Sequence, residues 1–178
     1  MARSQRRTSF CACEKQVFVR CFKQGGSTQW QNRVRRRYEI VAIAASTASI
    51  DTNALVRLLV KDDLQQTNTA LDLLSNFVAR SETLFVSATV VLELEWVLRS
   101  CYRFKKADVL AIFATVMSSV ELEFESEGAI EQALADYEEG NADFADYFHI
   151  AIAKKWDALP FMTFDVRAST AHGAKLLV

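Results

Sequence analysis

The feature that most constrains the fold is a regular alternation, from Ile40 onward, of short apolar segments with longer segments of helical periodicity. The short segments predict strands at residues 45–50, 84–87, 121–124, 161–164 and 175–178. The longer segments predict helices at residues 54–60, 64–79, 89–101, 105–118, 129–137 and about 142–156. Because strands separated by helices are expected to pair in parallel through right-handed crossovers, the pattern predicts an α/β fold. We expect a three-layer α/β/α sandwich with a central, mainly parallel sheet.

Two of the predicted helices show the face that each should bury. Helix 64–79 is expected to bury a stripe formed by Leu64, Ala70, Leu71, Leu74 and Val78. Helix 129–137 carries apolar residues at positions i, i+3, i+4 and i+7, namely Ile130, Ala133, Leu134 and Tyr137. Gly140 is expected to end this helix, since glycine is common just after a helix.

Charge is distributed unevenly along the chain of 178 residues. Residues 1–38 carry ten Lys or Arg residues and one acid, whereas residues 39–178 carry eleven bases and twenty-one acids. Contacts to phosphates come mainly from Lys and Arg, so the acidic body does not resemble a general nucleic-acid binder. If this body acts on RNA, it needs a local basic rim or a bound metal ion.

The basic segment, residues 1–40, is interpreted as a disordered extension, and residues 41–178 as one folded domain. A transit peptide, a basic arm for nucleic acid and a true translation start near Val41 are alternative explanations of the extension. No apolar run reaches the roughly 20 residues that span a bilayer, which predicts a soluble protein without membrane association. The cysteines of the extension lack a fourth ligand at zinc spacing, and nothing requires disulfides, so a cytoplasmic location is expected.

Acidic residues stand at the ends of predicted strands and near the starts of predicted helices. Asp51 follows the first strand, Glu93 lies among apolar residues one turn into the helix after the second strand, and Asp165 ends a later strand. Asp143 and Asp146 are three residues apart at the start of the last helix. Since the carboxyl ends of parallel strands share one edge of a sheet, we expect these side chains to meet. Crowded carboxylates repel one another unless cations are bound, and an all-oxygen set favours Mg²⁺ or Mn²⁺ over Zn²⁺.

Each acid also has an ordinary structural explanation. The two that follow strands could cap the next helix or turn, and the pair on the last helix could interact with the helix dipole. Glu93 could pair with Arg57 or Arg99 in a buried bridge, while Glu95 points to another face and is expected to be solvated. For any single acid the structural explanation is sufficient, but the recurrence of acids at such positions favours a metal site.

The segments that carry these acids together resemble PIN-domain ribonucleases, specifically the toxins of VapBC toxin–antitoxin pairs. The resemblance extends from about Ser49 to Val178, in order and with similar spacing. The matching segments are Ile50-Asp51-Thr52-Asn53-Ala54-Leu55-Val56-Arg57, Phe85-Val86-Ser87, Val91-Leu92-Glu93-Leu94-Glu95-Trp96-Val97-Leu98-Arg99, Ala142-Asp143-Phe144-Ala145-Asp146 and Leu159-Pro160-Phe161-Met162-Thr163-Phe164-Asp165.

The resemblance implies a role for each residue of the site. The catalytic and metal-binding quartet would be Asp51, Glu93, Asp146 and Asp165. Asp143 matches a frequent extra acid and is expected to bind metal as well. The polar positions that orient the site would be Asn53 and Thr163. The implied cofactor is Mg²⁺ or Mn²⁺, which activates a water molecule for attack on a phosphodiester bond.

The resemblance also implies a substrate and partners. The chain is expected to be an endoribonuclease toxin that forms a homodimer and is covered by an antitoxin protein. A basic partner segment would suit the acidic body. The tip of the predicted helical hairpin carries Arg99, Arg103, Lys105 and Lys106, which could either grip RNA phosphates or be simply solvated. Arg57, on the first helix, could touch RNA or a bound antitoxin.

Other functions remain open at this point. A housekeeping RNA-processing nuclease and a DNA-cutting nuclease would use the same carboxylates. A catalytically silent PIN-like interaction module would usually lack one of the carboxylates, and none is missing here. A response-regulator receiver also gathers acids at strand ends, but the sequence has neither its acidic pair before the first helix nor its lysine near the last strand.

Overall fold

Residues 48–178 are the part of the chain that the structure, a computed structural model, describes. The chain separates into two units, Met1–Ala42 and Ile43–Val178, and all described residues lie in the second unit. The predicted extension, its boundary at residues 40 and 41, and the first part of the predicted strand 45–50 lie outside the described residues.

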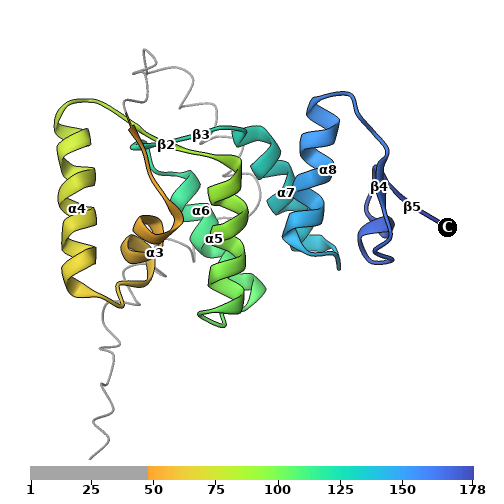
Figure 1. Cartoon of the computed structure of the whole chain (residues 1–178), viewed down its shortest axis with the longest axis horizontal. Coiled ribbons are helices and arrows are strands. Elements are labelled where there is room, and N and C mark those ends of the chain that lie inside the picture. The colour runs from red at the N-terminus through yellow and green to blue at the C-terminus, as the bar shows by residue number, and fades with distance from the viewer. Residues whose placement is uncertain (1–47) are drawn as a thin grey trace, which may run out of the picture. The chain divides into compact units, whose positions relative to one another are not determined.

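Short strands alternate with helices throughout the described residues, as the periodicity predicted (Figure 1). The strands are β1 (Ala48–Ser49), β2 (Leu84–Val86), β3 (Leu122–Phe124), β4 (Phe161–Thr163) and β5 (Ala174–Leu176). The α-helices are α3 (Thr52–Val60), α4 (Leu64–Ala79), α5 (Ala88–Ser100), α6 (Lys106–Met117), α7 (Glu127–Glu139) and α8 (Phe144–Lys155), and a short 3₁₀ helix, η1, covers Ala168–Thr170. Each lies within a few residues of its predicted position where one was predicted.

All strand pairs are parallel, which confirms the predicted α/β class. The strands form two sheets, a three-stranded sheet in the order β1-β2-β3 and a two-stranded sheet of β4 and β5. The middle strand β2 is the best covered, because the side chains of Leu84 and Val86 are fully buried. In the described residues β4 pairs with β5 and not with β1, so the sheet is divided where the prediction had one layer.

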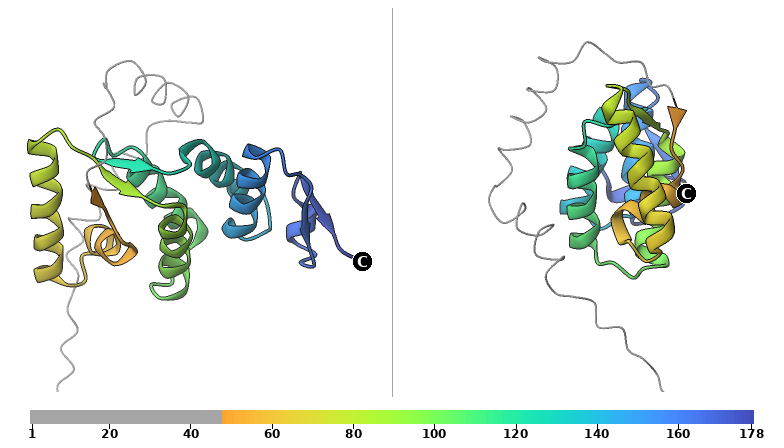
Figure 2. Two further views of the ribbon diagram at one scale, coloured as in Figure 1. Left: turned by 45° about the horizontal axis from the view of Figure 1, so that its top comes forward. Right: turned by 90° about the vertical axis from the view of Figure 1, so that its left-hand side faces the viewer.

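Helix α5 lies between the first helices of the domain and the last ones. Figure 1 and the left view of Figure 2 show α3 and α4 on one side of α5, and α7 and α8 on the other. The helix packs directly against α3, α6 and α8. Its buried residues Val91, Leu94 and Leu98 contribute to the hydrophobic core together with residues of β2, α6 and α8. The strands β4 and β5 follow α8; β4 packs against α8, and both strands pack against η1.

The predicted buried stripe of α4 is wrong in three of its five members. Leu64, Leu71 and Val78 are exposed, whereas Ala70 is buried. The helix turns inward the neighbouring face, which carries Thr67 and Phe77. Thr67 can be buried because its hydroxyl donates a 3.1 Å hydrogen bond to the carbonyl of Arg57 on α3. Although α4 exposes apolar residues, no described helix is both long enough and apolar enough to cross a bilayer.

Gly140 ends α7, as predicted, but for a different reason from the one that usually places glycine after a helix. Its φ of −98° is open to any residue, so no left-handed conformation is involved. Instead, a Cβ atom built on Gly140 would lie 1.8 Å from the hydroxyl oxygen of Tyr147. That hydroxyl accepts a 3.3 Å hydrogen bond from the backbone N–H of Ala142. Gly140 therefore makes room for the side chain that orders the turn into α8.

Candidate carboxylate site

Asp51 begins the first half of the candidate site. It is the N-cap of α3, and its Oδ1 accepts a 2.8 Å hydrogen bond from the backbone N–H of Ala54. Asp is a preferred N-cap because its side chain satisfies an N–H group that has no partner within the helix. The capping bond uses one carboxylate oxygen, so the second oxygen is available to a ligand. Asn53, the predicted supporting residue, is exposed on the same helix turn.

Glu93 of α5 joins this half through Thr52, a residue that was not predicted to belong to the site. The hydroxyl of the buried Thr52 donates a 2.5 Å hydrogen bond to Oε2 of Glu93. This bond fixes the exposed Glu93 carboxylate beside the start of α3. The alternative in which Glu93 pairs with Arg57 or Arg99 is wrong, because those two side chains pair with Asp62 and Glu95.

The second half contains the remaining three acids. Asp143 is the N-cap of α8, and it forms a reciprocal capping box with Asp146, whose Oδ2 accepts the N–H of Asp143 at 3.2 Å. Asp165 follows β4, and its Oδ1 accepts the N–H groups of Arg167 at 2.6 Å and Ala168 at 3.2 Å. The local structural explanations for these acids are therefore correct. Capping uses one oxygen of Asp146 and one of Asp165, so each carboxylate keeps an oxygen for another ligand.

The pKa values of the second half diverge. Burial raises the pKa of Asp146, with further upward contributions from the nearby carboxylates of Asp165 and Asp143 and a downward one from the Asp143 N–H. Backbone hydrogen bonds from Ala168 and Arg167 lower the pKa of Asp165. Thr163 supports the same turn, since its hydroxyl accepts the N–H of Asp165 at 3.0 Å. The pKa of Asp146 is thus raised, in part by the Asp165 carboxylate, while that of Asp165 is lowered by its own backbone hydrogen bonds.

In the described part of the chain, the two halves are not joined into one cluster of carboxylates. No group of three or more Asp, Glu, His or Cys side chains among residues 48–178 is close enough to hold a metal ion. The donor atoms are all carboxylate oxygens, which suits Mg²⁺ or Mn²⁺. Their arrangement does not suit a single ion, because Asp51 and Glu93 lie in one half and Asp146 and Asp165 in the other. The described structure therefore brings the predicted quartet together only as pairs.

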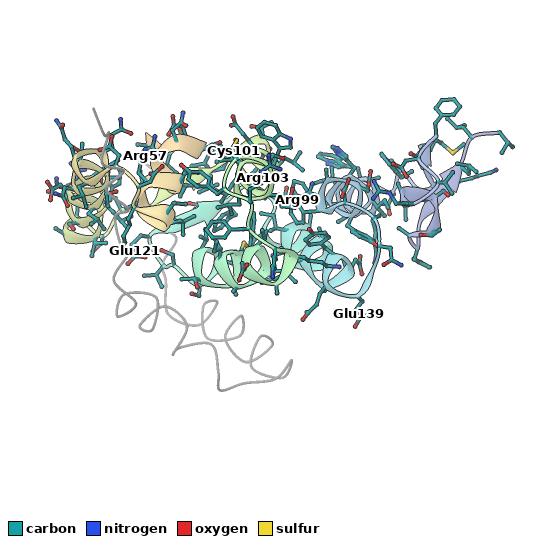
Figure 3. The ribbon with its side chains drawn as sticks, turned by 90° about the horizontal axis from the view of Figure 1, so that it is seen from below. Arg57, Arg99, Cys101, Arg103, Glu121 and Glu139 are labelled. Atoms are coloured by element: carbon teal, nitrogen blue, oxygen red, sulfur yellow. The ribbon has the colours of Figure 1, made fainter. Side chains whose placement is uncertain are left out.

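Several of the predicted RNA-binding cations already have protein partners. Arg57 contacts Asp62 at 2.5 Å and Gln66 at 2.6 Å. Nζ of Lys106 donates to the carbonyl of Gly140 at 2.8 Å and lies 4.7 Å from the ring centroid of Tyr137. Exposed cations at the hairpin between α5 and α6 are Arg103 and Lys105. Figure 3 shows Arg103 and Cys101 at this hairpin, near Arg99. The assignment of these residues to RNA binding stays a prediction.

Glu95 is buried, so the expectation that it is solvated is wrong. Its side chain is 3% exposed, and its Oε1 lies 2.5 Å from Nε of Arg99, although the N–H is not aimed along a hydrogen bond. The hydroxyl of Tyr137 on α7 donates to the same oxygen at 3.4 Å. Burial raises the pKa of Glu95, and the charge of Arg99 opposes this effect. The spacing of Glu95 and Arg99, four residues apart on one helix, was the signal that could have predicted the pair.

Asp143 is contacted by arginines from two directions. Nη1 of Arg99 lies 3.6 Å from Oδ1 of Asp143, and Nη2 of Arg167 lies 3.6 Å from Oδ2. The first arginine belongs to α5, which Figure 3 shows beside α8, and the second follows β4. Arg167 was not singled out from the sequence.

Comparison with known proteins gives one match, to a family model. The model of the PIN domain matches residues 48–173, which is most of the chain and includes both halves of the site. None of the curated proteins and none of the solved structures compared with the chain matches it. PIN domains are generally nucleases, and they usually use divalent metal ions. The parallel α/β architecture agrees with this match, and the chain belongs to the PIN domain family.

Proposed function

We propose that this PIN domain is a divalent-metal-dependent endoribonuclease and the toxin of a type II toxin–antitoxin pair of the VapBC kind. The observation that carries the proposal is the pairing of acids in a chain that matches the PIN model. Thr52 fixes Glu93 beside the start of α3, next to Asp51, and backbone N–H groups orient the carboxylates of Asp146 and Asp165.

Mg²⁺ or Mn²⁺ would be held by Asp51, Glu93, Asp146 and Asp165, if the two halves come together. Such an ion, when bound, stabilises charge on the phosphate and lowers the pKa of a bound water. The protein contributes the orientation of the carboxylates, because Ala54, Asp143, Arg167 and Ala168 donate backbone N–H groups to three of them. Carboxylates oriented in this way need little reorganisation when a ligand arrives.

The proposed partners follow from charge. Residues 39–178 carry twenty-one acids and eleven bases, so an antitoxin segment rich in Lys or Arg would be attracted to this body. RNA would be held by exposed cations such as Arg103 and Lys105 at the hairpin between α5 and α6. We further propose a homodimer, as in the toxins that the sequence resembles.

The test is cleavage of total RNA by the purified full-length chain with Mg²⁺, with EDTA, and with Mn²⁺ added back after EDTA. Asp51→Asn and Asp165→Asn remove one charge from each pair and are expected to abolish cleavage. Asp72→Asn is the matched control, since Asp72 is an exposed acid on α4 outside the site. Single-stranded DNA of the same sequence distinguishes an RNA-cutting from a DNA-cutting enzyme. Intact RNA in every lane, from folded protein free of antitoxin, would contradict the proposal.

A silent interaction module is the second candidate, and one observation favours it. No three potential ligands are gathered among residues 48–178, so the described arrangement does not by itself bind a metal ion. In that case Mn²⁺ would not bind to the folded chain and Asp51→Asn would leave all measured properties except stability unchanged. Growth arrest on expression of the wild type, and its loss in Asp51→Asn, would support the toxin instead.

A further inference from the structure

Asp143 shares its carboxylate between two arginines from different parts of the fold. Its Oδ1 lies 3.6 Å from Arg99 on α5, and its Oδ2 lies 3.6 Å from Arg167 after β4. The side chains of Arg99, Asp143 and Arg167 are 34%, 43% and 62% exposed. Exposed ion pairs contribute little stability individually. Here, however, one carboxylate links three parts of the fold that carry site residues, namely α5, the start of α8 and the turn after β4.

Two members of this bridge, Asp143 and Arg167, also orient proposed metal ligands through their backbone N–H groups. The backbone N–H of Asp143 donates to Oδ2 of Asp146, within the capping box of α8. The backbone N–H of Arg167 donates to Oδ1 of Asp165 at 2.6 Å. Asp143 is therefore connected to both other acids of the second half. It reaches Asp146 through its own backbone N–H, and Asp165 through its ion pair with Arg167. A change in its carboxylate would release the side chain of Arg167, whose backbone N–H holds Asp165.

Arg99 is the third member of the bridge, and it contacts a second carboxylate. Arg99 is fixed at its other edge by the buried Glu95, which also accepts from Tyr137 of α7. Carboxylates from α5 and from the start of α8 therefore attract the guanidinium of Arg99 at two of its edges. The bridge thus connects the acids after β4 and at the start of α8 to α5, the helix that carries Glu93.

The charges of the bridge argue against direct metal binding by Asp143. Both of its oxygens face a guanidinium, and a second cation brought to the same carboxylate would meet the repulsion of two positive charges. Groups that orient metal ligands from outside the coordination shell commonly carry such contacts. We propose that Asp143, held between Arg99 and Arg167, is a positioning residue that holds Asp146 and Asp165 in place relative to α5. This inference rests on the proposed function and reassigns one of its expected metal ligands.

The test asks whether each of two substitutions raises or lowers the affinity of the full-length chain for Mn²⁺. Binding is measured without RNA, from the electron paramagnetic resonance signal of free Mn²⁺. If Asp143 is a positioning residue, Asp143→Asn and Arg167→Met each weaken binding by roughly 10-fold or more, in line with changes to groups that orient ligands. Their effects are not additive, because either change breaks the same bridge. Arg167→Lys restores part of the affinity. Lys154→Met, at the other end of α8, is the control and leaves binding unchanged.

A direct metal ligand would behave differently. Arg167→Met would then tighten Mn²⁺ binding, because a competing cation is removed, while Asp143→Asn would weaken it. That pair of opposite signs overturns the proposal, as does an unchanged affinity in both variants. Arg167 is preferred to Arg99 for this test because loss of Arg99 would also leave Glu95 buried without its partner.

Failure of the proposed function can be told apart from failure of the bridge. If the wild type binds no Mn²⁺, the metal-dependent function is wrong, and the bridge is judged by amide hydrogen exchange in the same samples. Asp143→Asn is then expected to speed exchange at the amides of Arg167 and Ala168 by about 10-fold, because Arg167 loses its ion pair and the turn that presents both N–H groups to Asp165 is freed. Unchanged exchange at Arg167 and Ala168 would overturn the bridge.

Discussion

The pair formed by Glu95 and Arg99 gives an asymmetric prediction for stability. The Glu95 side chain is 3% exposed, whereas that of Arg99 is 34% exposed. Removal of the arginine leaves a carboxylate that cannot reach water, while removal of the glutamate leaves a guanidinium that can. We therefore expect Arg99→Met to cost much more free energy of unfolding than Glu95→Gln, although both break the same contact.

The magnitudes follow from the burial of the group left behind. Breaking a buried pair so that one charge is left without its partner costs about 3–5 kcal/mol, and the 3% exposure of Glu95 places Arg99→Met in that range. Glu95→Gln is expected to cost about 1 kcal/mol, because a glutamine still accepts from Tyr137 and the arginine remains partly hydrated. The difference between the two variants, about 2 kcal/mol or more, is well above the error of a denaturation experiment.

The pH dependence of the free energy of unfolding gives a second, independent test of the same pair. Burial raises the pKa of Glu95 above its ordinary 4.5, so the folded state binds this proton more tightly than the unfolded state does. A carboxyl group of this kind favours the fold while protonated and disfavours it increasingly as pH rises from about 4.5 through its folded pKa. Without Arg99 that pKa rises further, since the opposing charge is gone. The penalty of Arg99→Met should therefore be larger at pH 8 than at pH 5.

Urea unfolding of the full-length chain at both pH values measures these differences. Arg80→Met is the matched control, because Arg80 is an exposed arginine whose partner Glu82 lies near the surface, and its cost should be small and nearly independent of pH. Equal penalties for Arg99→Met and Glu95→Gln at pH 8 would refute the reasoning from burial. An Arg99→Met penalty that does not shrink at pH 5 would refute the reasoning from protonation.

Three further predictions concern packing and surface charge. Phe144→Ala should lower the free energy of unfolding by about 3–5 kcal/mol in urea titrations, since the ring is fully buried in an aromatic cluster. Gly140→Ala should lower the free energy of unfolding by about 1–3 kcal/mol, because the new Cβ meets the hydroxyl of Tyr147. Adding Tyr147→Phe to this variant should recover part of the loss. Equal melting temperatures of wild type and Gly140→Ala would contradict the close approach. The hydroxyl of Tyr102 and the guanidinium of Arg57 lower the pKa of Asp62, so its ionised form stabilises the fold above the ordinary pKa of 3.8. The destabilisation by Asp62→Asn should therefore be measurable in urea at pH 7 and disappear as pH falls well below 3.8.

The elements of the fold could be predicted because their signals are local. Helix α4 has the bounds Leu64–Ala79 that its periodicity predicted, and Asp51 caps α3 as its residue type favours. A cap depends on residues within one turn, so the sequence around it contains the whole interaction. The parallel pairing of the strands followed from the helices between them, and the structure confirms it.

Burial was less predictable, since it depends on neighbours that are distant in the sequence. Leu64 and Leu71 have the spacing of a buried stripe, yet α4 buries Thr67, whose hydroxyl bonds to α3. Glu95 is charged and was expected in water, yet Arg99 on its own helix and Tyr137 on α7 allow it to be buried. In both cases polar contacts, one for Thr67 and two for Glu95, accompany the burial of a side chain that its residue type would place in water.

The division of the acids into two halves could not be predicted from the positions of acids along the chain. Those positions say that each carboxylate follows a strand or begins a helix, and the structure agrees for Asp51, Asp143 and Asp165. Whether the halves meet depends on how β4 pairs, and strands of three residues carry too few side chains to specify a partner strand. The sequence therefore predicted the members of the site better than their grouping.

The capping role of the acids determines how their chemistry can be tested. Asp51, Asp146 and Asp165 each accept a backbone N–H, so an alanine at any of them removes an acceptor as well as a charge. Loss of an N-cap acceptor alone costs about 1 kcal/mol. An inactive Asp51→Ala would thus be ambiguous between a lost metal ligand and a frayed α3. Asparagine keeps an oxygen for the N–H and removes only the charge, so a loss of activity in Asp51→Asn at unchanged stability reports on the carboxylate itself.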